Sequence, residues 1–144
     1  MEVCGTHTTA IFRSGLRDLL PNKINLISGP GCPVCVTAQR DIDRMLSLAR
    51  AKDMIVATFG DMLKVPGTES SLEEERARGA DIRVVYSPLD VLEIARLEKH
   101  RQVVFLAVGF ETTAPAIAAV VKDAHRKKIK NLTVYSCHKL IPPA

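Results

Sequence analysis

The stretch VVFLAVGFETTAP, from Val103 to Pro115, joins an apolar run to a polar turn. Val103 to Val108 are apolar without interruption, a pattern that predicts a strand buried on both faces, as in a parallel sheet. After the glycine at position 109, Thr113 and Pro115 predict the start of a helix, because threonine caps helices and proline fits their first turn. The stretch therefore predicts one strand–turn–helix unit of an α/β protein.

The same unit recurs along the chain. Further short apolar runs rich in β-branched residues are Ile24–Ser28, Met54–Thr58, Ile82–Tyr86 and Leu132–Ser136. Helical patterns alternate with these runs, and they are expected over Thr9–Leu20, Thr37–Arg50, Ser71–Gly79, from Ser87 onward and from Thr113 onward. Such alternation builds an α/β fold with right-handed crossovers. We therefore expect an open, mainly parallel sheet of about five to six strands with helices on both faces.

The expected helices carry end signals and apolar faces. Thr37 and Ser87 are predicted N-caps, Ser71 with Glu74 forms a capping-box pattern, and Gly79 is a C-terminal stop. The residues expected to face the core are Phe12, Leu16, Leu19 and Leu20, then Ile42, Met45, Leu46 and Ala49, then Val91, Leu92 and Ala95, and finally Ile117, Val120, Val121 and Ala124.

Composition limits the class of protein. The chain has 144 residues, 47% of them hydrophobic and 25% charged, which indicates one globular domain over residues 1–144. It has no secretory leader and no apolar run of the roughly 20 residues that a membrane helix needs. Its four cysteines are too few for a disulfide scaffold, so we expect a reducing, cytoplasmic location.

The charge and the chain ends add two expectations. The net charge is +4, but the dense basic run, residues 125–130, falls at a predicted helix end, and the chain has no tryptophan. We therefore expect no nucleic-acid partner. Glu2-Val3-Cys4 is typical of the end of a strand, and the chain stops soon after its last expected strand, so a chain truncated at both ends is expected.

Each conspicuous polar loop follows the carboxyl end of a predicted strand. These loops are CGTHTT, SGPGCPVCVT, TFGDMLKVPG, GFETTAP and SCHKLIPP. Because ligand sites of open α/β sheets lie at the carboxyl ends of the strands, residues far apart in sequence are expected to meet at one rim. Asp61, in the third loop, is either a turn-former or a polar group of this rim.

The cysteines are the most distinctive rim residues. Cys32 and Cys35 are spaced to form a disulfide or to share a metal, and a following helix would lower a thiol pKa. The alternative, two small buried side chains, fits the tightly shaped C-P-x-C loop less well. Cys4 is equally a reactive or a buried thiol. Cys137 is more typical of a buried residue, and with His138 it receives no role.

Two further groups of residues have open interpretations. Glu111, Thr112 and Thr113 lie at a helix start, where free amides bind anions, but plain capping by a threonine explains them equally well. His7 is a metal ligand, a proton carrier or a helix-capping residue.

Taken together, these motifs resemble a known family. MEVCGTHT, SGPGCPVCVT, TFGDMLKVPG, VVYSPLD, VGFETTAP and HKLIPPA occur in the order seen in the hydrogenase maturation protein HypD family, and the resemblance covers essentially the whole chain. It implies a cytoplasmic scaffold, rather than a conventional turnover enzyme, on which the Fe(CN)2CO group of nickel–iron hydrogenase is assembled. The implied partners are the chaperone HypC, which shares the iron, and the HypE and HypF proteins.

The resemblance also implies roles for individual residues. Cys4 would be the iron ligand, and Cys32 with Cys35 would be a redox-active pair. Thr6, His7, Glu111, Thr112 and Thr113 would line the same cleft. The family also carries a cysteine-bound 4Fe–4S cluster in a more C-terminal region, and the ligands of that cluster are absent from this chain.

Two alternatives to the scaffold remain open. One is a stand-alone thiol–disulfide oxidoreductase that uses Cys32 and Cys35. The other is a structural zinc site formed by Cys4, Cys32 and Cys35 with His7 or His138, since three or four nitrogen and sulfur ligands suffice for zinc.

Overall fold

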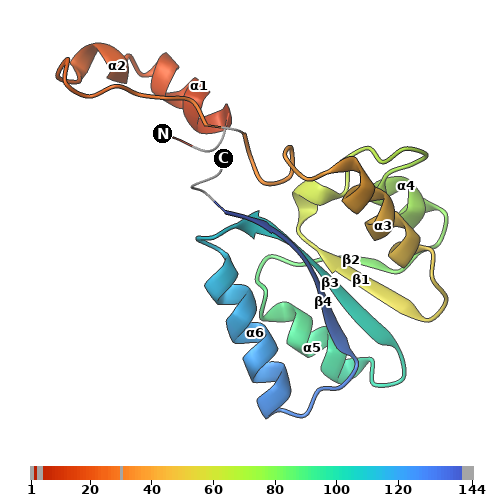
Figure 1. Cartoon of the computed structure of the whole chain (residues 1–144). Coiled ribbons are helices and arrows are strands. Elements are labelled where there is room, and N and C mark those ends of the chain that lie inside the picture. Colours follow the sequence, from red (N-terminus) through yellow and green to blue (C-terminus); the bar gives the residue numbers. More distant parts are fainter. Residues whose placement is uncertain (1, 3–4, 30, 141–144) are drawn as a thin grey trace.

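The computed structural model describes residues 2, 5–29 and 31–140 (Figure 1). The elements in chain order are α1 (Gly5–Arg13), α2 (Leu16–Leu19), α3 (Gln39–Ala49), β1 (Met54–Thr58), the 3-10 turn η1 (Gly60–Met62), α4 (Leu72–Ala77), β2 (Ile82–Val84), α5 (Asp90–Leu97), β3 (Gln102–Phe110), α6 (Ala114–Arg126) and β4 (Leu132–Lys139). None of the helices in these described ranges is long and apolar enough to cross a membrane.

The strands form one parallel sheet in the order β2-β1-β3-β4. β3 lies between β1 and β4, with Val103 opposite Ile55 on one side and Leu132 on the other. All but the first residue of β3 are buried, as the uninterrupted apolar run predicts. The α/β class and the parallel sheet are confirmed, but the described residues form four strands and not the five to six expected.

The missing strand is the one predicted at Ile24–Ser28. In this segment Ser28 forms an isolated parallel bridge with Glu2, and Ile24 and Ile27 are 48% and 55% exposed. An apolar run becomes a strand when a neighbouring strand covers it, and here the segment lies outside the four-stranded sheet (Figure 1). Of the strand end expected at Glu2-Val3-Cys4, only Glu2 lies within the described residues.

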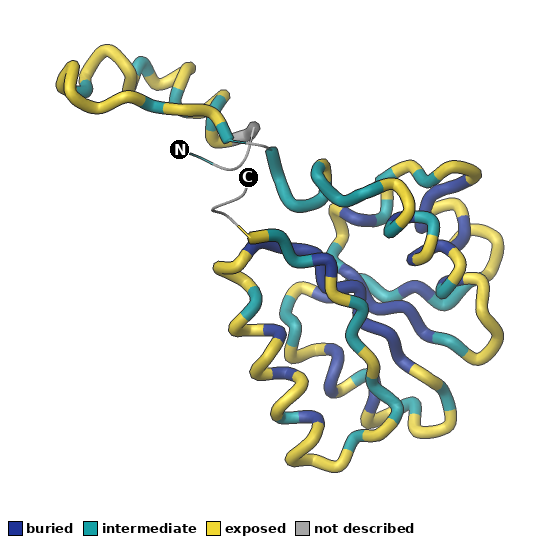
Figure 2. The backbone as a smooth tube through the Cα atoms, viewed as in Figure 1, coloured by how far each residue is buried: buried dark blue, intermediate teal, exposed yellow. Residues whose placement is uncertain are grey.

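Helices cover both faces of the sheet. α3 and α4 pack on one face, where Ile42, Met45 and Leu46 meet strand residues such as Val56 and Val104. α5 and α6 pack on the other, where Val91, Ala95 and Ile117 meet Ile55 and Phe105. Figure 2 shows the buried residues concentrated in the sheet and in the helix sides that face it. Every apolar residue predicted for the inner faces of these helices is buried except Val121, which is 50% exposed.

One predicted cap is wrong, and another lies just before its helix. The Thr37 hydroxyl donates to the carbonyl of Pro33 at 2.8 Å, and α3 begins at Gln39 without a side-chain cap. α5 begins at Asp90, later than predicted, but the Ser87 hydroxyl accepts the amide of Leu89 at 3.2 Å, as a capping serine does, and the Ser87 amide donates to the Asp90 carboxylate at 2.9 Å. The cap at Ser71 is confirmed, because its hydroxyl accepts the Glu74 amide.

The stop at Gly79 is also confirmed. α4 ends at Ala77, and Gly79 adopts a φ of +104°, a left-handed conformation that glycine takes without steric cost.

The helix predicted over Thr9–Leu20 is instead two short helices. Gly15, with a φ of +65°, separates α1 from α2. Together with the segment up to Ser28 they project from the sheet (Figure 1), and no residue between 7 and 28 is buried. Phe12 and Leu19, expected in the core, are 74% and 78% exposed.

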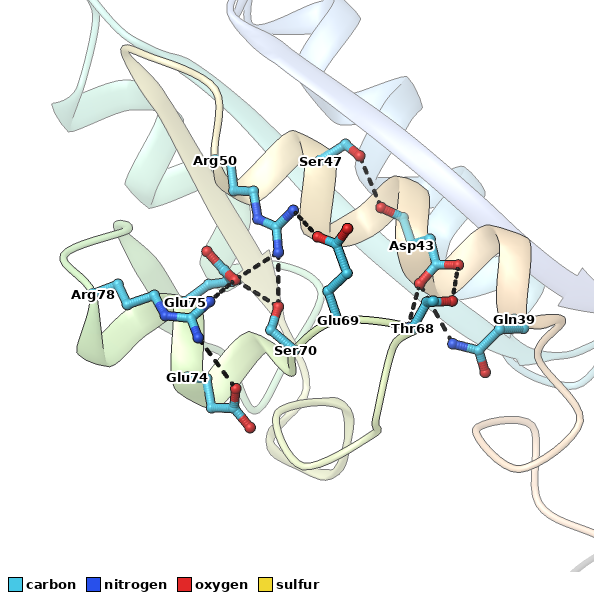
Figure 3. A network of polar contacts seen from close by, with 10 residues as sticks. All are labelled: Gln39, Asp43, Ser47, Arg50, Thr68, Glu69, Ser70, Glu74, Glu75 and Arg78. Carbon is cyan, nitrogen blue, oxygen red and sulfur yellow. Dashed lines mark hydrogen bonds and ion pairs between the residues drawn. The ribbon is translucent and has the colours of Figure 1, made fainter.

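A polar network fixes the long connection that follows β1. The Asp43 carboxylate of α3 accepts the amide and the hydroxyl of Thr68 at 2.7 and 2.8 Å (Figure 3). Arg50, at the end of α3, donates to Ser70 and to the buried carboxylate of Glu75. These hydrogen bonds, together with the one that Ser70 donates, lower the pKa of Glu75 to about 2. The network therefore ties the 66–71 segment to α3.

Glu75→Gln should lower the free energy of unfolding by about 1 to 3 kcal/mol, because Arg50 and Ser70 would then donate to a neutral amide instead of a charged carboxylate. The ionised carboxylate stabilises the fold above its ordinary pKa of 4.5, and this contribution disappears as the pH falls from 4.5 toward 2. Urea unfolding from pH 7 to pH 3 should therefore show the difference between the two proteins shrinking.

The matched control is Glu74→Gln, on the same helix. The Glu74 side chain is 56% exposed and meets Arg78 at 3.6 Å, so this change should have little effect. Equal losses in both variants would contradict the assignment of the network to Glu75.

Candidate functional site

The carboxyl ends of all four strands lie at one edge of the sheet, because the strands are parallel. From β1 the chain moves outward to β2 and then returns to β3 on the other side of β1. Such a reversal of strand order makes the crevice beyond the carboxyl ends of β1 and β3 the usual ligand site of an open α/β sheet. Exposed Asp61, in η1, and the turn at 110–114 border this position.

The two cysteines of the C-P-x-C loop are brought together. Their Sγ atoms lie 3.1 Å apart, and the backbone amide of Cys35 donates to the Cys32 sulfur at 3.3 Å. Cys35 is exposed and Cys32 is half-buried, and no disulfide joins them. A disulfide bond is about 2.05 Å long, so a movement of about 1 Å would join the sulfurs. The spacing in the sequence thus places the two sulfurs close enough for a disulfide to form between them.

The thiol loop lies on the α3 face of the rim. Val34, between the cysteines, packs against the cluster that contains Val108 and Cys137. Cys137 is 7% exposed, and burial raises the pKa of its thiol. It therefore serves as a core residue under the loop, as the sequence favours.

The 110–114 turn lies where β3 passes into α6. Thr113 occupies the N-cap position, but its side chain caps no amide of the helix, and its hydroxyl instead donates to the Phe110 carbonyl at 3.0 Å. The plain capping role considered for Thr113 is therefore wrong. The positions of Glu111 and Thr112 at the helix start are as predicted.

His138, which the sequence offers only as an alternative zinc ligand, lies on β4 beside this turn. It stands opposite Gly109 in the pairing of β3 with β4, and its Nε2 lies 2.9 Å from the place that a Cβ of residue 109 would take. Ser136 Oγ contacts its Nδ1 at 2.9 Å. Nε2 is buried without a hydrogen-bond partner, and burial lowers the imidazole pKa. The sequence alone did not indicate this approach of His138 to Gly109, because it depends on the register between β3 and β4.

The other predicted site residues are not brought together by the described contacts. Cys4, the expected iron ligand, lies outside the described residues. Thr6 lies on α1, and His7 on the same helix is exposed. Within the described ranges no three His, Cys, Asp or Glu side chains are grouped as metal ligands. A zinc site therefore gains no support from the residues whose positions are described.

Fold and rim together define an α/β protein with a close pair of unbridged cysteines and a glycine-threonine turn at the carboxyl edge of a parallel sheet. The family model HypD, described as "Hydrogenase formation hypA family", matches residues 1–144. The chain therefore belongs to the HypD family.

Relatives of established name agree. The chain is 49% identical over 145 residues to the hydrogenase maturation factor HypD of Cupriavidus necator and, equally, to that of Azotobacter vinelandii. It is 46% identical over 143 residues to the Escherichia coli factor of the same name. These matches cover 99 to 100% of this chain and 38% of each relative, so the chain spans well under half of their length.

Alkylation should distinguish the three cysteines whose environments are described. With iodoacetamide under native conditions, Cys35 should react first and Cys32 next, while Cys137 should react only on unfolding, because it is buried and its thiol pKa is raised. Peptide mass spectrometry after mild oxidation should show a Cys32–Cys35 disulfide, with the loss of two hydrogens. Early labelling of Cys137 would contradict the packing described above.

Gly109→Ala should destabilise the fold by about 1 to 3 kcal/mol, because the new methyl group would overlap the Thr113 hydroxyl and press on the His138 ring. Gly60→Ala is the matched control at the neighbouring strand end, where a Cβ would meet Val84 at an ordinary 3.5 Å. Thermal unfolding of both variants is the measurement. A Gly60 variant that loses as much as the Gly109 variant would refute the close approach.

Proposed function

We propose that this chain is the part of a hydrogenase maturation factor that holds the Fe(CN)2CO group during its assembly, together with a HypC-like chaperone. Family membership supports a role in hydrogenase maturation. The observation that carries the proposal is the proximity of the Cys32 and Cys35 sulfurs, which lie 3.1 Å apart without a disulfide.

The chemistry of sulfur suits this task. Cys4 supplies a thiolate ligand to the iron, because a soft thiolate matches low-spin iron that carries carbon monoxide and cyanide. Cys32 and Cys35 act beside it as a two-electron couple. A dithiol that closes to a disulfide gives up two electrons and two protons, so the pair could supply or relay the electrons that ligand transfer to the iron consumes. A 4Fe–4S cluster of the longer family members would return them.

The remaining site residues act on the same cargo. Thr6 and His7 line the approach to Cys4, and Glu111, Thr112 and Thr113 present polar groups from the 110–114 turn. HypE-like and HypF-like proteins deliver the cyanide in the cytoplasm, and no nucleic acid or membrane takes part. The Thr113 hydroxyl supports this role, because it is not used to cap α6.

A stand-alone thiol–disulfide oxidoreductase is the second candidate, and the accessible pair favours it. Against it, α3 begins at Gln39, beyond Cys35, so the helix N-terminus does not sit directly on the motif. Such an enzyme should reduce a model disulfide without a partner. The scaffold should not do so at a significant rate.

A chimera tests the proposal. This chain should replace the matching 143-residue segment of the Escherichia coli relative, in a strain that lacks that relative. We expect hydrogenase activity to be restored, and the chimera purified with its HypC partner should show infrared bands of cyanide and carbon monoxide. Cys4→Ala should abolish the bands, and Cys32→Ser or Cys35→Ser should reduce hydrogenase activity at least tenfold.

Cys137→Ser is the matched control, because this thiol belongs to the core and has no part in the proposed chemistry. Its chimera should keep most of the activity. Bands that persist in the Cys4→Ala chimera would overturn the ligand assignment, and full activity without Cys32 and Cys35 would overturn the redox role.

A further inference from the structure

The starting point is an unpaired atom. Within the described ranges, two buried side-chain polar atoms have no hydrogen-bond partner, namely Thr58 Oγ1 and His138 Nε2. Thr58, the last residue of β1, is fully buried, whereas His138 is only partly buried and lies beside the turn that carries Glu111 to Thr113. Native proteins pair almost all such atoms, so an unpaired one at a functional edge needs an explanation.

The surroundings of Nε2 are narrow. Nε2 and the Thr113 hydroxyl oxygen both lie within 2.9 Å of the point that a Cβ of Gly109 would occupy. The two atoms are therefore at most 5.0 Å apart, the sum of 2.1 and 2.9 Å, beside the space that the glycine leaves free. At this position glycine is what allows the turn and the histidine to approach.

The Thr113 hydroxyl has a choice of acceptors. It now donates to the Phe110 carbonyl at 3.0 Å, within its own turn, and it caps no amide of α6. A hydroxyl carries one proton and can direct it to only one acceptor at a time. If the ring carries its proton on Nδ1 and donates it to Ser136 Oγ, Nε2 has a free lone pair and is the second acceptor.

We propose that His138 is a positioning residue of the rim site. When the iron cargo binds, Nε2 of His138 accepts the Thr113 hydroxyl, which then no longer donates to the Phe110 carbonyl. This exchange sets the conformation of the 110–114 turn. The inference rests on the proposed function, because it needs a cargo at this turn. His138 acts through Thr113 and does not itself contact the cargo. The Ser136 contact is compatible with the required tautomer, because Oγ can accept a proton from Nδ1.

The environment of the ring supports an acceptor role. Burial lowers the imidazole pKa, so the ring is neutral at pH 7 and keeps a lone pair on one nitrogen. The N-terminus of α6, which begins at Ala114, carries partial positive charge and also disfavours an imidazolium nearby. A neutral histidine with one fixed nitrogen is suited to hold a hydroxyl.

The test uses the chimera described above, with three variants. His138→Leu removes both nitrogens, Thr113→Val removes the hydroxyl at nearly constant shape, and the third variant combines them. Each single change should lower hydrogenase activity about tenfold, and the combined variant should be no worse than the poorer single one. Thermal midpoints should stay equal or rise for His138→Leu, because the unpaired atom is gone.

Further measurements separate positioning from simple packing. His138→Gln keeps a neutral hydrogen-bonding group and should recover part of the activity lost in His138→Leu. The matched control is His125→Leu, at an exposed position near the end of α6, which should keep full activity. Nitrogen-15 NMR of the chain should show His138 neutral at pH 7 with the proton on Nδ1.

Each result decides the question. Full activity in His138→Leu, additive losses in the combined variant, or a proton on Nε2 would overturn the inference. A loss of activity that merely follows a lower thermal midpoint, in His138→Gln as well, would show a packing role and overturn it too. A chimera that is inactive with the unaltered chain would instead count against the proposed function.

Discussion

The pairing of β3 with β1 on one side and β4 on the other is the constraint on which the rest of the structure depends. β3 is buried along all but its first residue, so its apolar run can fold only between two covered faces and two neighbouring strands. Parallel pairing then directs every strand end to the same edge. η1 and the 110–114 turn are thereby brought to one edge, and the thiol loop reaches the same part of the fold through the packing of Val34.

The register of β4 places a thiol on one face of the sheet and an imidazole on the other. Successive residues of a strand point to opposite faces, so Cys137 joins the cluster under α3 while His138 lies beside the start of α6. The thiol loop packs on the α3 face through Val34, and the 110–114 turn lies on the α6 face. A shift of one residue would exchange the two side chains and separate the histidine from Gly109.

Strands were predictable where burial alone decides and less so where a neighbour decides. Met54–Thr58 matches β1 fully, whereas β4 extends past Ser136 through polar residues to Lys139 because β3 runs alongside it to Phe110. Ile24–Ser28 has the composition of a strand but, among the described residues, no such neighbour. The cap at Thr37 failed because its hydroxyl donates to the Pro33 carbonyl and α3 begins two residues later, at Gln39. A local sequence pattern predicts that an element exists, and the strands that pair with it determine where it begins and ends.

The same distinction between local and long-range contacts applies to the candidate site. Cys32 and Cys35 were identifiable because their pairing is local, set by a three-residue spacing and a tight turn. The His138 position was not, because its neighbours Gly109 and Thr113 reach it through the β3–β4 register. Its unpaired Nε2 lowers the stability of the fold, and a leucine of similar volume would avoid that cost. A polar atom that the isolated fold does not use is explained most directly by a state of the protein in which it has a partner.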